Sequence, residues 1–251
     1  MSDFERGTAR SIPHTADMSV DAGLRAFMLG VYNKMAIGLV VSAALAYAVA
    51  NFAPVRDLLY VVNPVTGAFA GYQILGVVLA FAPLVLLLAA GFMMKNVTPA
   101  SSGALYWTVV SVIGASGAVW VLRYTGASLA STFLITATAF GALSLFGYTT
   151  KKDLSGWGTF LIMGVWGLIA ASIATWFFRS PMLYMIIAVA GVLIFAGLTA
   201  YDTQRLKMTY YELGGDRQRM AVATNIGALH LYLDFINLFQ FLLALLGGRR
   251  E

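Results

Sequence analysis

Two aspartates in strongly apolar segments are the residues of this chain best placed to do chemistry. Asp234 lies within Gly227 to Leu246, GALHLYLDFINLFQFLLALL, which is long enough to cross a bilayer. A carboxylate at that depth costs about 2.5–3.5 kcal/mol to insert, so it needs a partner, a proton or a water-filled cavity. Asp202 ends the preceding apolar segment, in the run LTAYDTQR. Two acids on consecutive membrane helices indicate proton or cation chemistry.

Three polar residues of the last segment share one helical face. His230, Asp234 and Asn237 follow i, i+4, i+7 spacing, so we expect this face to point into the bundle. Asp202 lies 21 residues after Pro181, about 31 Å along a helix, near the cytoplasmic end of its span. There it could simply cap the helix, or it could meet Asp234, which is expected about two turns into the last helix. Two carboxylates in contact would share a proton and titrate as one unit.

The composition is that of an integral membrane protein. Hydrophobic residues make up 60% of the 251 residues and charged residues only 11%, whereas soluble domains carry about 25% charged residues. The mean hydropathy is +0.80. The absence of cysteine excludes disulfides and thiolate chemistry, and with only two histidines we expect no transition-metal site and no cofactor. The basic residues are scattered, so no nucleic-acid partner is expected.

The apolar runs predict seven transmembrane helices, with a polar tail at residues 1–28 before a helical domain at 29–248. The tail has no apolar core and is therefore not a signal peptide. The predicted fold class is an all-α integral membrane protein. The expected helices are 29–52, 72–94, 104–122, 127–148, 157–178, 183–204 and 222–246.

Lysine and arginine placement predicts the orientation, because short cytoplasmic loops carry the excess of positive charge. With the N-terminus in the cytoplasm, eleven of the 16 basic residues lie inside and five lie outside, including Arg249 and Arg250. A re-entrant last segment would change the split to thirteen and three. We nevertheless predict seven spans, because 226–246 has the length of a span and irregular backbone at membrane depth must be covered by protein.

Three signatures resemble the Bax inhibitor, or transmembrane Bax inhibitor motif, family, especially its bacterial members. They are GYTTKKDLSG (Gly147 to Gly156), GLTAYDTQRLK (Gly197 to Lys207) and GALHLYLDFINLF (Gly227 to Phe239). VYNKMAIGL, from Val31 to Leu39, opens the match. The resemblance covers almost everything after the N-terminal tail.

This resemblance implies two three-helix layers around a central C-terminal helix, and a pH-sensitive calcium leak governed by two aspartates. The matching positions are Asp202 and Asp234, which would also be weak calcium ligands. A basic latch residue of some relatives would correspond to Lys95, which could pair with either acid or simply anchor its helix at the interface. His230 and Asn237 would support the pair.

The expected function is therefore a cation leak, for calcium in particular, gated by protons, in a bacterial inner membrane. No enzyme activity is expected. An intramembrane aspartyl protease is disfavoured because residues 231–234 read LYLD, where presenilin-type enzymes carry GxGD. The alternative is a regulatory membrane protein that binds a membrane protease or another membrane complex, because bacterial relatives include regulators of membrane-bound proteolysis.

Overall fold

The computed structural model describes residues 21–250 apart from 94–96, 176 and 179. Within these residues, seven helical segments are long and apolar enough to cross a membrane. The protein is thus an all-α integral membrane protein, as predicted. The spans are α1 (Ala22–Asn51), α3 (Ile74–Met93), α4 (Pro99–Ser116) with α5 (Ala118–Arg123), α6 (Gly126–Thr149), α7 (Ser155–Ala174), α8 (Pro181–Glu212) and α9 (Arg217–Leu246).

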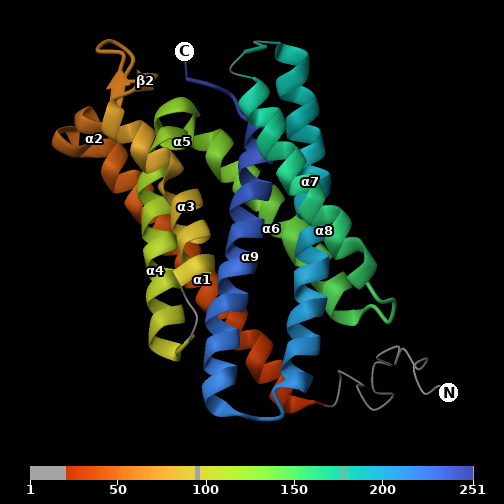
Figure 1. Ribbon diagram of the computed structural model, residues 1–251. Helices are drawn as coiled ribbons and strands as arrows, with labels where there is room; N and C mark the ends of the chain where they lie inside the picture. Colours follow the sequence, from red (N-terminus) through yellow and green to blue (C-terminus); the bar gives the residue numbers. More distant parts are fainter. Residues whose placement is uncertain (1–20, 94–96, 176, 179, 251) are drawn as a thin grey trace.

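Helix α9 lies at the centre of the bundle and packs against α1, α4, α6 and α8. On one side α1 and α3 pack on α4, and on the other α6 and α7 pack on α8. Figure 1 shows α9 running between these two groups over the full height of the bundle. Two three-helix layers around a central C-terminal helix are therefore confirmed. Because α9 is continuous over 30 residues, the re-entrant alternative for the last segment is wrong.

The two ends of the bundle carry different parts of the chain (Figure 1). The start of α1 and the turn between α8 and α9 lie at one end, which we call the N-terminal end. The residues after α9 lie at the other, the C-terminal end, together with α2 (Ala53–Leu59) and an antiparallel hairpin of β1 (Tyr60–Val62) and β2 (Phe69–Tyr72). The hairpin and α2 were not predicted, because each is too short to produce a periodic pattern.

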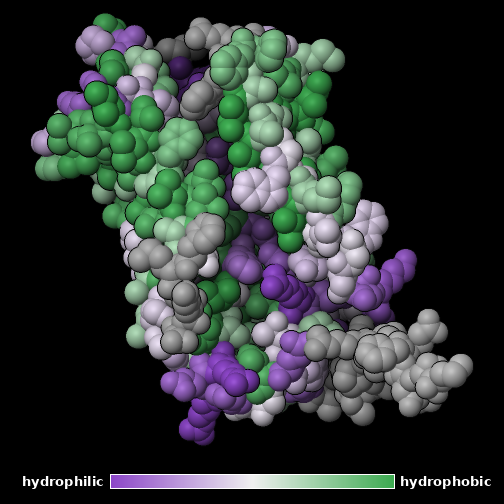
Figure 2. Space-filling model, viewed as in Figure 1, coloured by the Kyte–Doolittle hydropathy of each residue, from purple (hydrophilic) through white to green (hydrophobic). Residues whose placement is uncertain are grey.

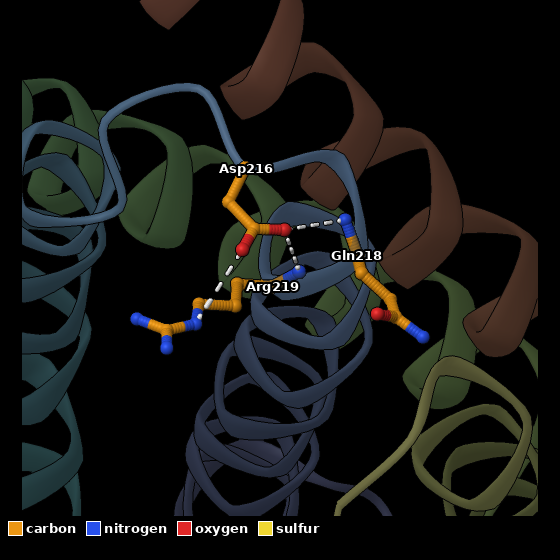
Figure 3. Close-up of polar contacts among 3 residues, drawn as sticks. All are labelled: Asp216, Gln218 and Arg219. Atoms are coloured by element: carbon orange, nitrogen blue, oxygen red, sulfur yellow. Dashed lines mark hydrogen bonds and ion pairs between the residues drawn. The ribbon is translucent and has the colours of Figure 1, made fainter.

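Side-chain caps fix where several helices begin. Asp21 accepts a hydrogen bond from the Leu24 amide at 2.9 Å at the start of α1. Asp216 caps α9 by accepting from the amides of Gln218 and Arg219 at 2.9 and 3.1 Å, and its second oxygen lies 3.5 Å from Arg219 Nε (Figure 3). The tight turn before it is formed by Gly214 and Gly215, both with positive φ.

Several helices extend further than the apolar runs predicted; α4, for example, begins at Pro99 rather than 104. Helix α1 begins at Ala22 rather than 29, α8 continues to Glu212 rather than 204, and α9 starts at Arg217 rather than 222. The apolar run marks the part of a helix that meets lipid, whereas polar residues continue the same helix into the aqueous boundary. Asp202 consequently lies about 15 Å from the end of α8, and Asp234 about 26 Å into α9, deeper than the predicted two turns.

Glycine permits the closest helix contacts. A Cβ at Gly147 of α6 would collide with the carbonyl oxygen of Ala200 on α8, two residues before Asp202. A Cβ at Gly114 of α4 would lie 2.7 Å from Cα of Ser42 on α1. These contacts fit the use of small residues for close approach between membrane helices. The third span is also interrupted at Gly117, where α4 ends and α5 begins.

Candidate functional site

A hollow of about 680 Å³ opens at the N-terminal end between α8 and α9. Figure 2 shows hydrophilic atoms gathered between these two helices in the lower half of the molecule. Among the residues that line the hollow are Asp202 and Arg205 of α8, and Arg219 and His230 of α9. We call it the N-terminal hollow. It makes the level of the first predicted acid accessible from the N-terminal end.

The two predicted acids occupy different positions with respect to this hollow. Asp202 lines it with a side chain that is 13% exposed. Asp234 is only 4% exposed, and its carboxyl group lies close enough to that of Asp202 for the two to interact. Oδ2 of Asp234 is buried, and no donor group among the described residues reaches it. A carboxyl group in such surroundings is best satisfied when the pair holds a proton.

His230 stands between bulk water and the pair. It lies one turn before Asp234 on α9, its side chain is 39% exposed, and Nδ1 is 4.0 Å from Oδ2 of Asp202. Asn237, the third residue of the predicted face, donates to the carbonyl of Leu233 at 2.8 Å, and no hydrogen bond joins it to either acid among the described residues. The structure thus brings His230, Asp202 and Asp234 together and leaves Asn237 outside the group. Lys95 lies outside the described residues.

Close packing of α8 and α9 holds the acids in contact. A Cβ at Gly227 of α9 would meet the end of the Leu206 side chain of α8, so glycine leaves room for that side chain at this crossing. Asp234 is buried along with apolar residues near it on α9, among them Leu231, Phe235 and Leu238. The helix spacing therefore buries the acid within the bundle, and Gly227 permits the close packing of α9 against α8 nearby.

Two sets of hydrogen-bonded hydroxyl groups include residues close to the acids in the chain, Thr203 and Tyr232, and sequence reasoning missed them. The hydroxyl of Tyr32 lies 2.5 Å from Ser144 Oγ, which is 2.9 Å from Thr203 Oγ1. On the other side of α9, the Tyr232 hydroxyl lies 2.6 Å from Ser42 Oγ. Tyr32 and Ser144 are 112 residues apart in the chain. Only their polarity within apolar runs could have indicated them.

A second missed contact joins three helices near the N-terminal end. Lys34 of α1 donates from Nζ to Oδ1 of Asn225 on α9 at 2.5 Å. The Asn225 amide in turn donates to the Pro99 carbonyl at 3.0 Å and to Ser102 Oγ at 2.9 Å, both on α4. This network fixes the entry of α9 into the bundle. The network contains no acidic residue, so Lys34 donates to a neutral amide oxygen rather than to a carboxylate.

The described residues contain no group of three or more histidine, aspartate or glutamate side chains that could hold a metal ion. Two carboxyl groups and one imidazole are too few ligands to hold a hard cation tightly, because such an ion takes six or more oxygen ligands.

The family described as "inhibitor of apoptosis-promoting Bax1" matches residues 24–251. This chain belongs to the Bax inhibitor family. It is 68% identical to a protein of Caulobacter vibrioides over the full length of both chains. It is 40% identical to the inner membrane protein YbhL of Escherichia coli strain K12, over 91% of this chain and 94% of YbhL. A protein of Rickettsia prowazekii, RP147, is 39% identical over 92% of this chain and 93% of its own. The matched region includes both Asp202 and Asp234.

Proposed function

We propose that this Bax inhibitor family protein is a passive cation pathway, for calcium in particular, that is gated by protonation of the Asp202–Asp234 pair. The contact between these two carboxyl groups at the end of the N-terminal hollow is the observation that carries the proposal. Asp202 meets water and Asp234 does not, so protons can exchange with the pair from one side only.

A closed state is supported by the packing beyond the pair. Phe195, Leu198, Leu238 and Phe241 form an apolar layer between α8 and α9, and Leu238 is only 1% exposed. The rings of Phe195 and Phe241 are stacked with centroids 5.9 Å apart. A hydrated cation has no polar partner in this layer. Opening therefore requires α8 and α9 to separate.

Loss of the shared proton supplies a physical reason for such a separation. When both carboxylates are ionised they repel each other in a medium of low dielectric constant, and the repulsion acts between the same two helices that close the pathway. Two carboxylate oxygens then face the hollow and attract a hard cation. We further propose that the N-terminal end faces the cytoplasm, following the excess of basic residues there.

The test is calcium entry into liposomes that contain the purified protein and a trapped calcium dye, measured from pH 5 to pH 8. We expect flux that changes with pH in the wild-type protein and loses that change in Asp234→Asn. Asp57→Asn is the matched control, because Asp57 is an exposed acid of α2 that pairs with Arg56 at 2.7 Å, far from the hollow.

Flux no greater than that of empty vesicles at every pH would overturn the proposal. In that case the alternative takes its place: a regulatory membrane protein that binds a membrane protease or another membrane complex.

A further inference from the structure

A second hollow, of about 860 Å³, lies at the C-terminal end between α7, α8 and the end of α9. Its wall is mainly apolar and includes Ile187 and Ala188 of α8 with Ala244 and Leu245 of α9. Arg123 and Arg249 line it as well, and both are exposed. We call it the C-terminal groove. An apolar wall with two guanidinium groups is a combination that the cation pathway does not use.

The backbone fixes these two arginines next to one another. After α9, Arg249 forms an antiparallel bridge with Tyr124, and the amide of Arg250 donates to the carbonyl of Arg123 at 2.9 Å. The amide of Gly248 donates to Ser128 Oγ at 2.8 Å. Figure 1 shows the chain leaving α9 toward α5. The positions of both arginine side chains therefore depend on a built contact rather than on a free tail.

Neither arginine has an acidic partner in the part of the chain that the structure describes. The ion pairs there include Arg56 with Asp57, Arg219 with Asp216 and His230 with Asp202, and none involves Arg123 or Arg249. Arg123 instead places its guanidinium 5.7 Å from the centre of the Phe69 ring. Two adjacent cations without a counter-charge are unfavourable alone and favour an anion between them.

We propose that the C-terminal groove binds an anionic phospholipid of the surrounding bilayer, with its phosphodiester between Arg123 and Arg249 and part of an acyl chain along the apolar wall. Guanidinium groups bind phosphate oxygens through paired, charge-assisted hydrogen bonds. The groove borders exposed apolar side chains of α8, including Tyr184 and Met185. It therefore opens toward lipid where helix ends meet headgroups, and the bilayer supplies the ligand.

The experiment counts phospholipid molecules retained by the full-length protein in a maltoside detergent, by native mass spectrometry. The protein is titrated with phosphatidylglycerol and, separately, with phosphatidylcholine of the same acyl chains. We expect tighter binding of phosphatidylglycerol, and an affinity about tenfold lower in Arg123→Gln/Arg249→Gln, because two charge-assisted hydrogen-bond sites are lost. Arg56→Gln is the matched control, since Arg56 lies at the same end but outside the groove.

A second variant tests the apolar wall without changing charge. Ala244→Trp fills the groove and should lower phosphatidylglycerol affinity, whereas Ala130→Trp, at an exposed site of α6 outside the groove, should not. Thermal unfolding in detergent identifies any variant that fails to fold.

Equal binding of the two lipids, or an equal loss of affinity in Arg56→Gln, would overturn the proposal. Competition by glycerol phosphate as strong as that by phosphatidylglycerol would also overturn it, because the site would then recognise a soluble anion.

Discussion

Helices α8 and α9 border a hollow at each end of the bundle, and the two hollows differ in where their charges lie. In the N-terminal hollow the acids stand at the inner end, and the deeper one is 4% exposed. In the C-terminal groove the charges are exposed arginines. A buried carboxyl must exchange a proton or find a cation, whereas an exposed guanidinium keeps its charge at any physiological pH. Under the two proposals, depth separates a buried pair of acids from an exposed pair of arginines at the opposite end of the bundle.

The apolar layer between them keeps the two hollows apart. Its members, Phe195, Leu198, Leu238 and Phe241, lie on α8 and α9 at the level where these helices touch. A Cβ at Gly191 would collide with the Phe241 ring, so α8 and α9 are in close contact at this layer. The difference between the two ends persists only while this layer is closed.

The largest expected effect comes from opening that layer. Phe241→Ala removes a ring that packs on Gly191 and Phe195. Removing a fully buried phenylalanine ring costs about 3–5 kcal/mol of stability. Because Phe241 is only partly buried, we expect a somewhat smaller loss. Calcium flux should rise and become less dependent on pH, since the two hollows are then joined. Stability is followed by thermal unfolding in detergent and flux in liposomes.

Leu246→Ala is the control for this change, because Leu246 is an exposed apolar residue of the same helix. Unchanged flux in a folded Phe241→Ala protein would mean that the layer does not close the pathway.

The next effect should come from forcing α6 away from α8. Gly147→Val adds atoms where a Cβ already meets the Ala200 carbonyl, so we expect about 1–3 kcal/mol of destabilisation and an altered pH response through Asp202. Gly141, on the same helix, has open space where a Cβ would lie, so Gly141→Val should change stability and the pH response much less. Equal losses of stability in the two variants would show that the contact does not position α8.

A smaller effect on flux is expected from a charge change in the C-terminal groove alone. Arg249→Gln removes a positive charge of the C-terminal groove, at the opposite end of the bundle from the paired acids. The rate of calcium flux can therefore change while its pH midpoint stays within about 0.3 units of the wild-type value. Flux recorded in liposomes of fixed lipid composition provides the comparison. A displaced midpoint would mean that the two ends are electrostatically coupled.

The smallest effect is expected outside both hollows. Hydrogen bonds from the side chain and amide of Ser155 lower the pKa of Asp153 below 3.8. A lowered folded-state pKa stabilises the protein above the unfolded pKa, and the contribution is lost as pH falls through the folded pKa. Asp153→Ala should therefore lower the melting temperature at pH 7 by at most about 2 °C, and by less near pH 3. An equal loss at both pH values would contradict this origin.

The sequence predicted the features that depend on length and apolar content. The seven spans follow from runs of about 20 apolar residues, and the family signatures gave the layered arrangement. The network of Lys34 with Asn225 and the chain from Tyr32 to Thr203 could not be predicted, because each joins residues more than 50 positions apart through tertiary packing. The depth of Asp234 was underestimated because polar residues lengthen α9 beyond its apolar run.

The proton-sharing pair is tested most directly by the pH dependence of calcium flux at pH 6, 7 and 8 in four proteins: wild type, Asp202→Asn, Asp234→Asn and the double variant. Asparagine keeps the size and hydrogen bonding of aspartate but removes titration. If the two carboxyl groups hold one proton between them, each single variant should lose the pH response and the double variant should add little, because both act in one titrating unit. Single variants that both keep the wild-type pH profile would contradict the paired-aspartate gate.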